Sequence, residues 1–134
     1  MTLNPPSPAP PRPTDAELSL LRILWRRGPS TVREVCDAIQ SERAINYTTV
    51  LKLLQIMTEK GLCERDESAR SHVYRPTRSE AETQTSLVHD LLDRAFAGSR
   101  AQLVMRALEE RPPSEEELAE LKAILRDFSR RRAR

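Results

Sequence analysis

Cysteine, glycine and aromatic residues are scarce in this chain. Its 134 residues include two cysteines, three glycines, one tryptophan, two tyrosines and two phenylalanines. Cys36 and Cys63 form no CxxC pair, so we expect reduced thiols, a cytoplasmic location and no paired-cysteine metal site. His72 has no second histidine or acidic residue at ligand spacing, which favours a packed or surface histidine over a metal ligand.

Long apolar stretches and catalytic motifs are also missing. No apolar run approaches the roughly 18 residues that a membrane helix needs. The first residues also do not contain a basic segment followed by an apolar one. We therefore expect no signal peptide and no membrane insertion. The absence of an HExxH motif, a phosphate-binding loop and a nucleophile–base set argues against an enzyme and a bound cofactor. The net charge of +2 permits nucleic acid binding without demanding it.

Proline is concentrated in the first residues. Residues 1–13 hold six of the ten prolines, which predicts a disordered or polyproline-like tail. The alternative is a proline-rich ligand for a partner protein. The rest of the chain divides into residues 14–76 and residues 77–134, whose hydrophobic patterns differ.

The segment 46–61 is the one around which the chain is organised. It opens with the helix-capping residue Asn46 and closes with Gly61, a good helix stop. An apolar stripe at helical spacing predicts a face packed on a core: Val50, Leu53, Leu54 and Met57. Other faces carry side chains that can contact phosphates and base edges: Thr48, Thr49, Lys52 and Gln55. Taken alone, the same pattern also fits an ordinary amphipathic surface helix.

Two short helices come before this segment. Capping boxes predict that they run over residues 14–27 and 31–40. The polar linker 41–45 then leads into the helix of segment 46–61, and this pair of helices is typical of a helix-turn-helix. Cys36 lies on the apolar stripe of the second helix, which predicts a core side chain rather than a reactive thiol.

The hydrophobic period changes from about 3.6 to about 2 after Gly61. Segments 62–65 and 71–75 predict two strands joined by the polar turn 66–70. A hairpin directly after a helix-turn-helix is a winged-helix arrangement. Arg70 at the tip of the wing is either a phosphate contact or a solvated loop arginine.

Three further helices are predicted in residues 77–134, and they begin at Ser79, Ser99 and Ser114. Short amphipathic helices bury little alone, so we expect a second copy of the chain to cover their apolar stripes. The predicted dimerisation residues are Leu91, Leu92, Leu118, Leu121, Leu125 and Phe128. The predicted fold is therefore mainly α with a small β-hairpin wing: an N-terminal winged helix-turn-helix followed by a C-terminal helical dimerisation module.

Six segments carry a wider resemblance, in the order TDAELSLLRILW, GPSTVREVCDAI, YTTVLKLLQIMTEKGL, HVYRP, AFAGSRAQLVMRALEE and EELAELKAIL. Together they resemble the penicillinase-repressor (BlaI/MecI) family of winged-helix transcriptional repressors, over about residues 14–128. The resemblance implies a homodimer whose winged helix binds dyad-symmetric, double-stranded operator DNA and blocks transcription. By position it implies a recognition helix over Tyr47–Lys60, with DNA contacts from Thr48, Thr49 and Lys52 and a further one from Gln55.

The resemblance also implies how repression ends. In founding members a membrane metallopeptidase that senses β-lactams triggers cleavage of the repressor in its dimerisation region. The bond aligns near Arg106–Ala107, where founding members carry Asn-Phe, a pair that this chain lacks. This chain has Ile56 where many members carry Arg, so the operator sequence of those members does not carry over directly to this chain. It lacks the C-terminal cysteine cluster of the copper-responsive branch, so copper sensing is not expected.

Two other functions share much of this pattern. A ligand-sensing winged-helix repressor would release DNA on binding a small molecule, and a winged helix can also serve protein–protein contact alone. The exposed set Thr48, Thr49 and Lys52, with Arg70 on the wing, suits phosphate and base contact better than a protein groove. The sequence therefore favours a dimeric, sequence-specific DNA-binding repressor.

Overall fold

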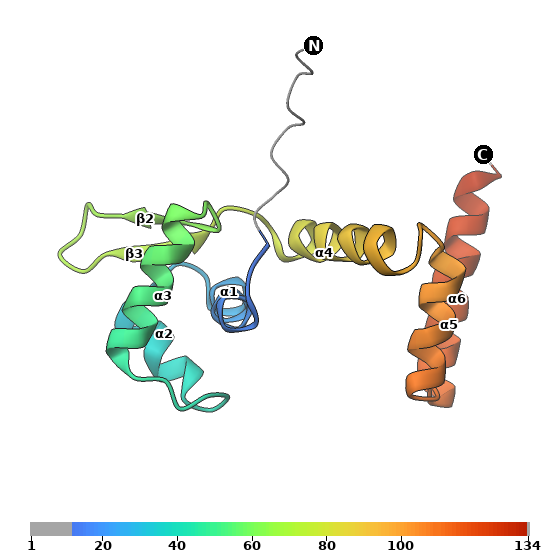
Figure 1. Ribbon diagram of the computed structural model, residues 1–134, viewed down its shortest axis with the longest axis horizontal. Coiled ribbons are helices and arrows are strands. Elements are labelled where there is room, and N and C mark those ends of the chain that lie inside the picture. The colour runs from blue at the N-terminus through green and yellow to red at the C-terminus, as the bar shows by residue number, and fades with distance from the viewer. Residues whose placement is uncertain (1–11, 134) are drawn as a thin grey trace, which may run out of the picture. The chain divides into compact units, whose positions relative to one another are not determined.

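A computed structural model describes residues 12–133, which form six helices and three short strands (Figure 1). The elements are α1 (Asp15–Arg27), β1 (Ser30–Thr31), α2 (Val32–Ile39), α3 (Tyr47–Glu59), β2 (Cys63–Asp66), β3 (Val73–Pro76), α4 (Glu80–Ala95), α5 (Arg100–Glu110) and α6 (Glu115–Arg132). The tail predicted for residues 1–13 lies outside the described residues, apart from its last two.

Side-chain caps begin the helices where the sequence predicts them. At the start of α1 the Thr14 hydroxyl accepts a hydrogen bond from the Glu17 N–H at 3.2 Å, and the Glu17 carboxylate accepts one from the Thr14 N–H at 2.9 Å. The same reciprocal pair begins α2 at Thr31 and α6 at Ser114. Each pair satisfies N–H groups that the first turn of a helix leaves unpaired, so these boundaries follow from local sequence.

The strands form one antiparallel sheet in the order β1-β3-β2. β2 and β3 are the predicted hairpin, and Glu64 lies opposite Arg75 with the two side chains paired, Arg75 Nε to Glu64 Oε2 at 3.1 Å. The sequence did not predict β1, whose two residues pair with Val73 and Tyr74 on the other edge of β3. β1 directly precedes α2, so this pairing joins the wing to the helix-turn-helix.

The hydrophobic core is formed by α1, α2, α3 and the sheet, and all of its buried apolar side chains fall between Leu20 and Tyr74. From α3 it takes Val50, Leu54 and Met57, each 0% exposed. Both cysteines are buried and free, and the core position predicted for Cys36 is confirmed. Because the core is complete within these residues, the winged helix is a self-contained packing unit.

The chain divides into two compact units, Met1–Val88 and His89–Arg134, so the boundary falls within α4. The first part of α4 belongs to the winged-helix unit. Just before α4, the Arg78 carbonyl oxygen accepts a hydrogen bond from the Trp25 indole N–H of α1 at 3.0 Å, and Thr83 in the first turn of α4 is buried. Among the described residues, no helix has both the length and the apolar content needed to cross a bilayer.

The second unit has little interior of its own. α5 and α6 lie wholly within the described range, and neither contains a buried residue. Large apolar side chains are exposed along this unit: Leu91, Val104, Met105, Leu118, Leu121, Ile124, Leu125 and Phe128. A concentration of exposed apolar side chains of this kind marks a surface that associates with another molecule.

One buried carboxylate links the start of α1 to the end of α3. Glu17 is 2% exposed, and its Oε1 accepts a hydrogen bond from Lys60 Nζ at 2.6 Å. Burial opposes ionisation of Glu17, but hydrogen bonds from Lys60 and Thr14, together with the Lys60 charge, outweigh it and lower the pKa of the carboxyl. Glu17 therefore closes a helix cap and holds the end of α3 against α1.

Glu17→Gln should make the fold less stable at neutral pH by about 1–2 kcal/mol, because the Lys60 ammonium would then donate to a neutral amide oxygen instead of a carboxylate. The pKa of Glu17 is lowered in the folded state, so its stabilising effect is complete above the unfolded-state value. It is lost as the pH falls through the lowered folded value. Urea unfolding between neutral pH and pH 3 should therefore show the two stability curves converging in acid.

Glu34→Gln is the matched control, because Glu34 closes the same kind of cap on α2 from an exposed position. Water screens its ion pair, so its loss of stability should be smaller. A constant gap between the wild-type and Glu17→Gln curves across this pH range would contradict the role given to the Glu17 charge.

Candidate nucleic-acid interface

The helix α3 has one face in the core and the other open to solvent. Asn46 caps it by accepting a hydrogen bond from the Thr49 N–H at 2.8 Å. The predicted contact residues are all exposed: Thr48, Thr49, Lys52 and Gln55. At 3.6 residues per turn they fall within one arc opposite the buried stripe. Ile56 adds a 36% exposed apolar side chain to the same arc. The structure thus places the four predicted residues of α3 on one accessible surface.

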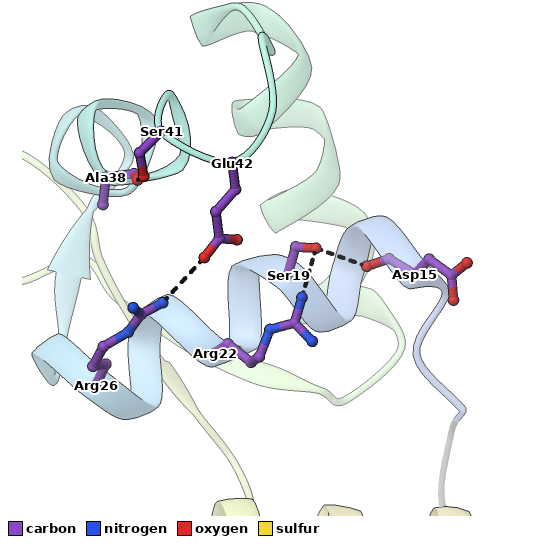
Figure 2. Close-up of polar contacts among 7 residues, drawn as sticks. All are labelled: Asp15, Ser19, Arg22, Arg26, Ala38, Ser41 and Glu42. Carbon is purple, nitrogen blue, oxygen red and sulfur yellow. Dashed lines mark hydrogen bonds and ion pairs between the residues drawn. The ribbon is translucent and has the colours of Figure 1, made fainter. Parts of the chain in front are cut away.

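The connection between α2 and α3 is held by side chains on both sides. Gln40 Nε2 donates to the Ile45 carbonyl oxygen at 2.6 Å, which closes the loop on itself. Figure 2 shows the second restraint, an ion pair of 3.4 Å between Arg26 of α1 and Glu42 of the loop. In the same view Arg22 bonds to the Ser19 hydroxyl on α1. The Gln40 and Arg26–Glu42 contacts therefore restrain the connection from which α3 begins.

The wing lies next to α3 (Figure 1). Arg70 is in the β2–β3 connection and is exposed, as predicted. At the start of this connection, the Asp66 carboxylate accepts a hydrogen bond from the Ser68 N–H at 2.9 Å. Hydrogen bonding from the Ser68 side chain, and then from its backbone N–H, lowers the pKa of the Asp66 carboxyl. The turn is therefore ordered by its own side chain at the point where the chain leaves β2.

A cleft of about 280 Å³ lies between the helix-turn-helix and the wing. Its lining includes Arg33 from α2, Tyr47 and Leu51 from α3, and Arg70, Ser71 and His72 from the wing. The guanidinium of Arg33 stacks on the Tyr47 ring, with its Cζ 5.0 Å from the ring centroid. The structure therefore brings the wing arginine and the first turn of α3 to one cleft.

Arg33 and Tyr47 were not predicted as functional residues. The sequence signal that could have found them is their position, since Tyr47 is the first residue of α3 and Arg33 is in the first turn of α2. In a helix-turn-helix the recognition helix reaches DNA with its N-terminal residues. Their mutual contact, however, joins two helices and has no signature in either helix alone.

The remaining predicted residues lie in the second unit. Leu91, Leu118, Leu121, Leu125 and Phe128 are exposed and Leu92 is half-buried. Arg106 and Ala107, at the bond that aligns with the cleavage position, are exposed within α5. Arg106 Nη1 pairs there with Glu109 Oε2 at 2.8 Å. Across residues 12–133, no group of three or more His, Cys, Asp and Glu side chains could hold a metal ion.

Comparison with known proteins decides the family. Residues 13–127 match the family described as penicillinase repressor. This chain belongs to the penicillinase repressor family. The penicillinase repressor of Bacillus licheniformis is 26% identical over 122 residues, which cover 91% of this chain and 95% of that protein. The transcriptional regulator BlaI of Mycobacterium tuberculosis is 34% identical over 97 residues, which cover 71% of this chain and 70% of that one.

A solved structure extends the likeness to the fold. A MarR family protein from Bacillus stearothermophilus aligns with a TM-score of 0.51 and 18% identity, covering 90% of this chain and 76% of that one. Membership of the penicillinase repressor family confirms the resemblance drawn from the sequence, and with it the winged-helix fold and the class of transcriptional repressor. The individual DNA contacts, the dimerisation residues and the cleavage bond stay predictions.

Proposed function

We propose that this penicillinase repressor family member is a homodimer whose winged helices bind double-stranded operator DNA and thereby block transcription. The observation that carries the proposal is the solvent-facing arc of α3, with Thr48, Thr49 and Lys52 in its first turns and a fully buried face behind it. Hydroxyl and ammonium groups at the start of a recognition helix can contact base edges and flanking phosphates. Membership of a family of repressors supports the same function.

The second unit supports the dimer. Its helices α5 and α6 bury no residue within the chain, while α6 exposes an apolar stripe in which Leu125 is 68% and Phe128 is 58% exposed. A second copy offers an identical apolar stripe, so a two-fold axis would bury both at once. Two winged helices held together would then bind two half-sites of an operator jointly, which raises the affinity of each.

Loss of this dimer is the proposed route to release from DNA. α5 connects α4 to α6, and the bond Arg106–Ala107 lies within it. A cut there, by a membrane metallopeptidase of the kind that the family resemblance implies, would separate α6 from the winged helix. The core of the winged helix would stay intact, because its buried apolar residues all precede α4.

Lys52→Ala tests the DNA-binding face directly. An operator is first selected from random duplex DNA with the full chain, and binding is then titrated by mobility shift over a range of salt concentrations. We expect weaker binding and, if Lys52 contacts a phosphate, a salt slope lower by about one per protomer, because one fewer phosphate is neutralised.

Lys122→Ala is the control for this titration, because Lys122 is an exposed lysine of α6, outside the winged helix. Its affinity and salt slope should equal those of the wild type. If Lys52→Ala binds with unchanged affinity and unchanged slope, Lys52 is not part of the interface. If the wild-type chain enriches no sequence at all, the DNA-binding proposal itself fails.

A further inference from the structure

The cleft between the helix-turn-helix and the wing holds cationic side chains outside the arc of α3. We propose that it binds one phosphate of the operator backbone, with Arg33 as the main contact and Tyr47 as the side chain that positions it. This inference rests on the proposed DNA-binding function and adds a phosphate site separate from Lys52. Sequence patterns alone gave neither residue a role.

Contact between Arg33 and Tyr47 holds a positively charged side chain in position at this cleft. The Arg33 guanidinium lies 5.0 Å from the centre of the Tyr47 ring, and Tyr47 is 42% exposed. Stacking on an aromatic face fixes the plane of a guanidinium and leaves its N–H fork free to point outward. A fork held in one plane loses less side-chain entropy when it engages a phosphate than a mobile arginine does.

The rest of the lining suits an anion. Arg70, Ser71 and His72 enter the cleft from the wing, and arginine and hydroxyl groups are common donors to phosphate oxygens. Charge-assisted hydrogen bonds from a planar guanidinium to phosphate are among the strongest of this kind. The cleft thus offers donors from α2 on one side and from the wing on the other.

The carboxylate next to Arg33 in the sequence has partners of its own. Glu34 accepts a hydrogen bond from the Thr31 N–H at 2.9 Å and pairs with Arg27 at 3.3 Å. The bond from the Thr31 backbone, then its hydroxyl, lowers the pKa of Glu34. Glu34 is therefore occupied by its cap and by Arg27, and not by Arg33.

The position of the cleft favours a phosphate of DNA over a free anion. Tyr47 directly precedes Thr48, so a phosphate held at the cleft lies beside the residues proposed to reach the bases. Phosphates that flank the contacted bases fix the register of a recognition helix on the duplex. Arg33 would then set how α3 enters the groove, whereas Thr48 and Thr49 would read it.

The first test uses full-length variants and the selected operator. Arg33→Ala should weaken binding about tenfold and lower the salt slope by about one per protomer. Arg33→Lys should restore the slope but only part of the affinity, because a lysine keeps the charge without the planar fork. Tyr47→Leu should reduce affinity and leave the slope unchanged. Arg22→Ala, an exposed arginine of α1, is the control and should behave as the wild type.

The second test neutralises the DNA instead of the protein. Operators carrying one neutral methylphosphonate per half-site are titrated with the wild type and with Arg33→Ala. At one position the wild type should lose about tenfold in affinity while Arg33→Ala loses nothing further, because the same contact is already gone. Penalties that add at every position would overturn the assignment, as would wild-type affinity and slope for Arg33→Ala.

A free-anion site gives a different result. Inorganic phosphate, compared with chloride at equal ionic strength, should compete for the operator no better than the salt does. Selective competition that Arg33→Ala abolishes would overturn the assignment to the DNA backbone. If Lys52→Ala weakens operator binding but Arg33→Ala does not, the phosphate site in the cleft is rejected, whereas the proposed DNA-binding function is retained.

Discussion

Replacing Leu121 by aspartate should convert the protein to a monomer and lower its operator affinity by about 100-fold or more. Leu121 lies on the apolar stripe of α6 between Leu118 and Leu125. An aspartate there would have to be buried without a partner when two copies meet, which costs several kcal/mol. Sedimentation at low micromolar concentration should show the monomer, and the mobility-shift titration should show the loss of joint half-site binding.

Ala123→Asp is the matched control, because it places the same carboxylate on the opposite face of α6. Ala123 is exposed, and it is removed by about half a turn from the centre of the stripe. This variant should remain a dimer and keep its operator. Thermal unfolding should show an intact winged helix in both variants, since their changes lie outside its core. A dimer that persists in Leu121→Asp would place the interface elsewhere.

Cutting the chain between Arg106 and Ala107 should release operator DNA to a similar extent. A protease recognition sequence is introduced at this bond, the purified dimer is cleaved, and binding is measured again. We expect a loss of about 100-fold or more, because the joint binding of two half-sites depends on the covalent link to α6. Residues 14–76 should stay folded, since the buried core ends at Tyr74.

Two controls accompany the cut. The uncut protein with the introduced sequence should bind as the wild type does, and the same sequence appended after Arg134 should allow cleavage without effect on binding. Because a helix must open locally before a protease can bind its backbone, uncut α5 should be cleaved slowly. If the cleaved dimer holds its operator as tightly as the intact one, dimerisation does not control release, and a small-molecule inducer becomes the better hypothesis.

Local chemistry explains what the sequence could predict. Capping boxes such as Thr14 with Glu17 and Ser114 with Glu117 need only residues within one turn, and the structure contains them as predicted. The stripe of α3 follows from its own periodicity, so its buried and open faces were predictable. The exposed arc with Thr48, Thr49, Lys52 and Gln55 follows from the same period, whereas no local pattern says what that arc contacts.

The features that escaped prediction depend on residues far apart in the chain. β1 is two residues long, too short for a period, and exists only because β3 pairs with it. From the sequence, Glu17 is only a capping residue of α1. In the structure it is buried and pairs with Lys60, which lies 43 positions later in the chain. The Arg33–Tyr47 stack joins two helices whose connecting loop is restrained by Gln40, Arg26 and Glu42.

The composition of the sheet edges affects how copies of this protein can meet. β3 is paired on both sides, so the open edges belong to β1, which has two residues, and to β2. On β2, Glu64, Arg65 and Asp66 are all exposed. Short or charged edge strands resist pairing with the strands of another molecule and so suppress aggregation. In the proposed dimer, which would carry two such sheets, we therefore expect the apolar helices to associate while the wings stay separate and accessible to DNA.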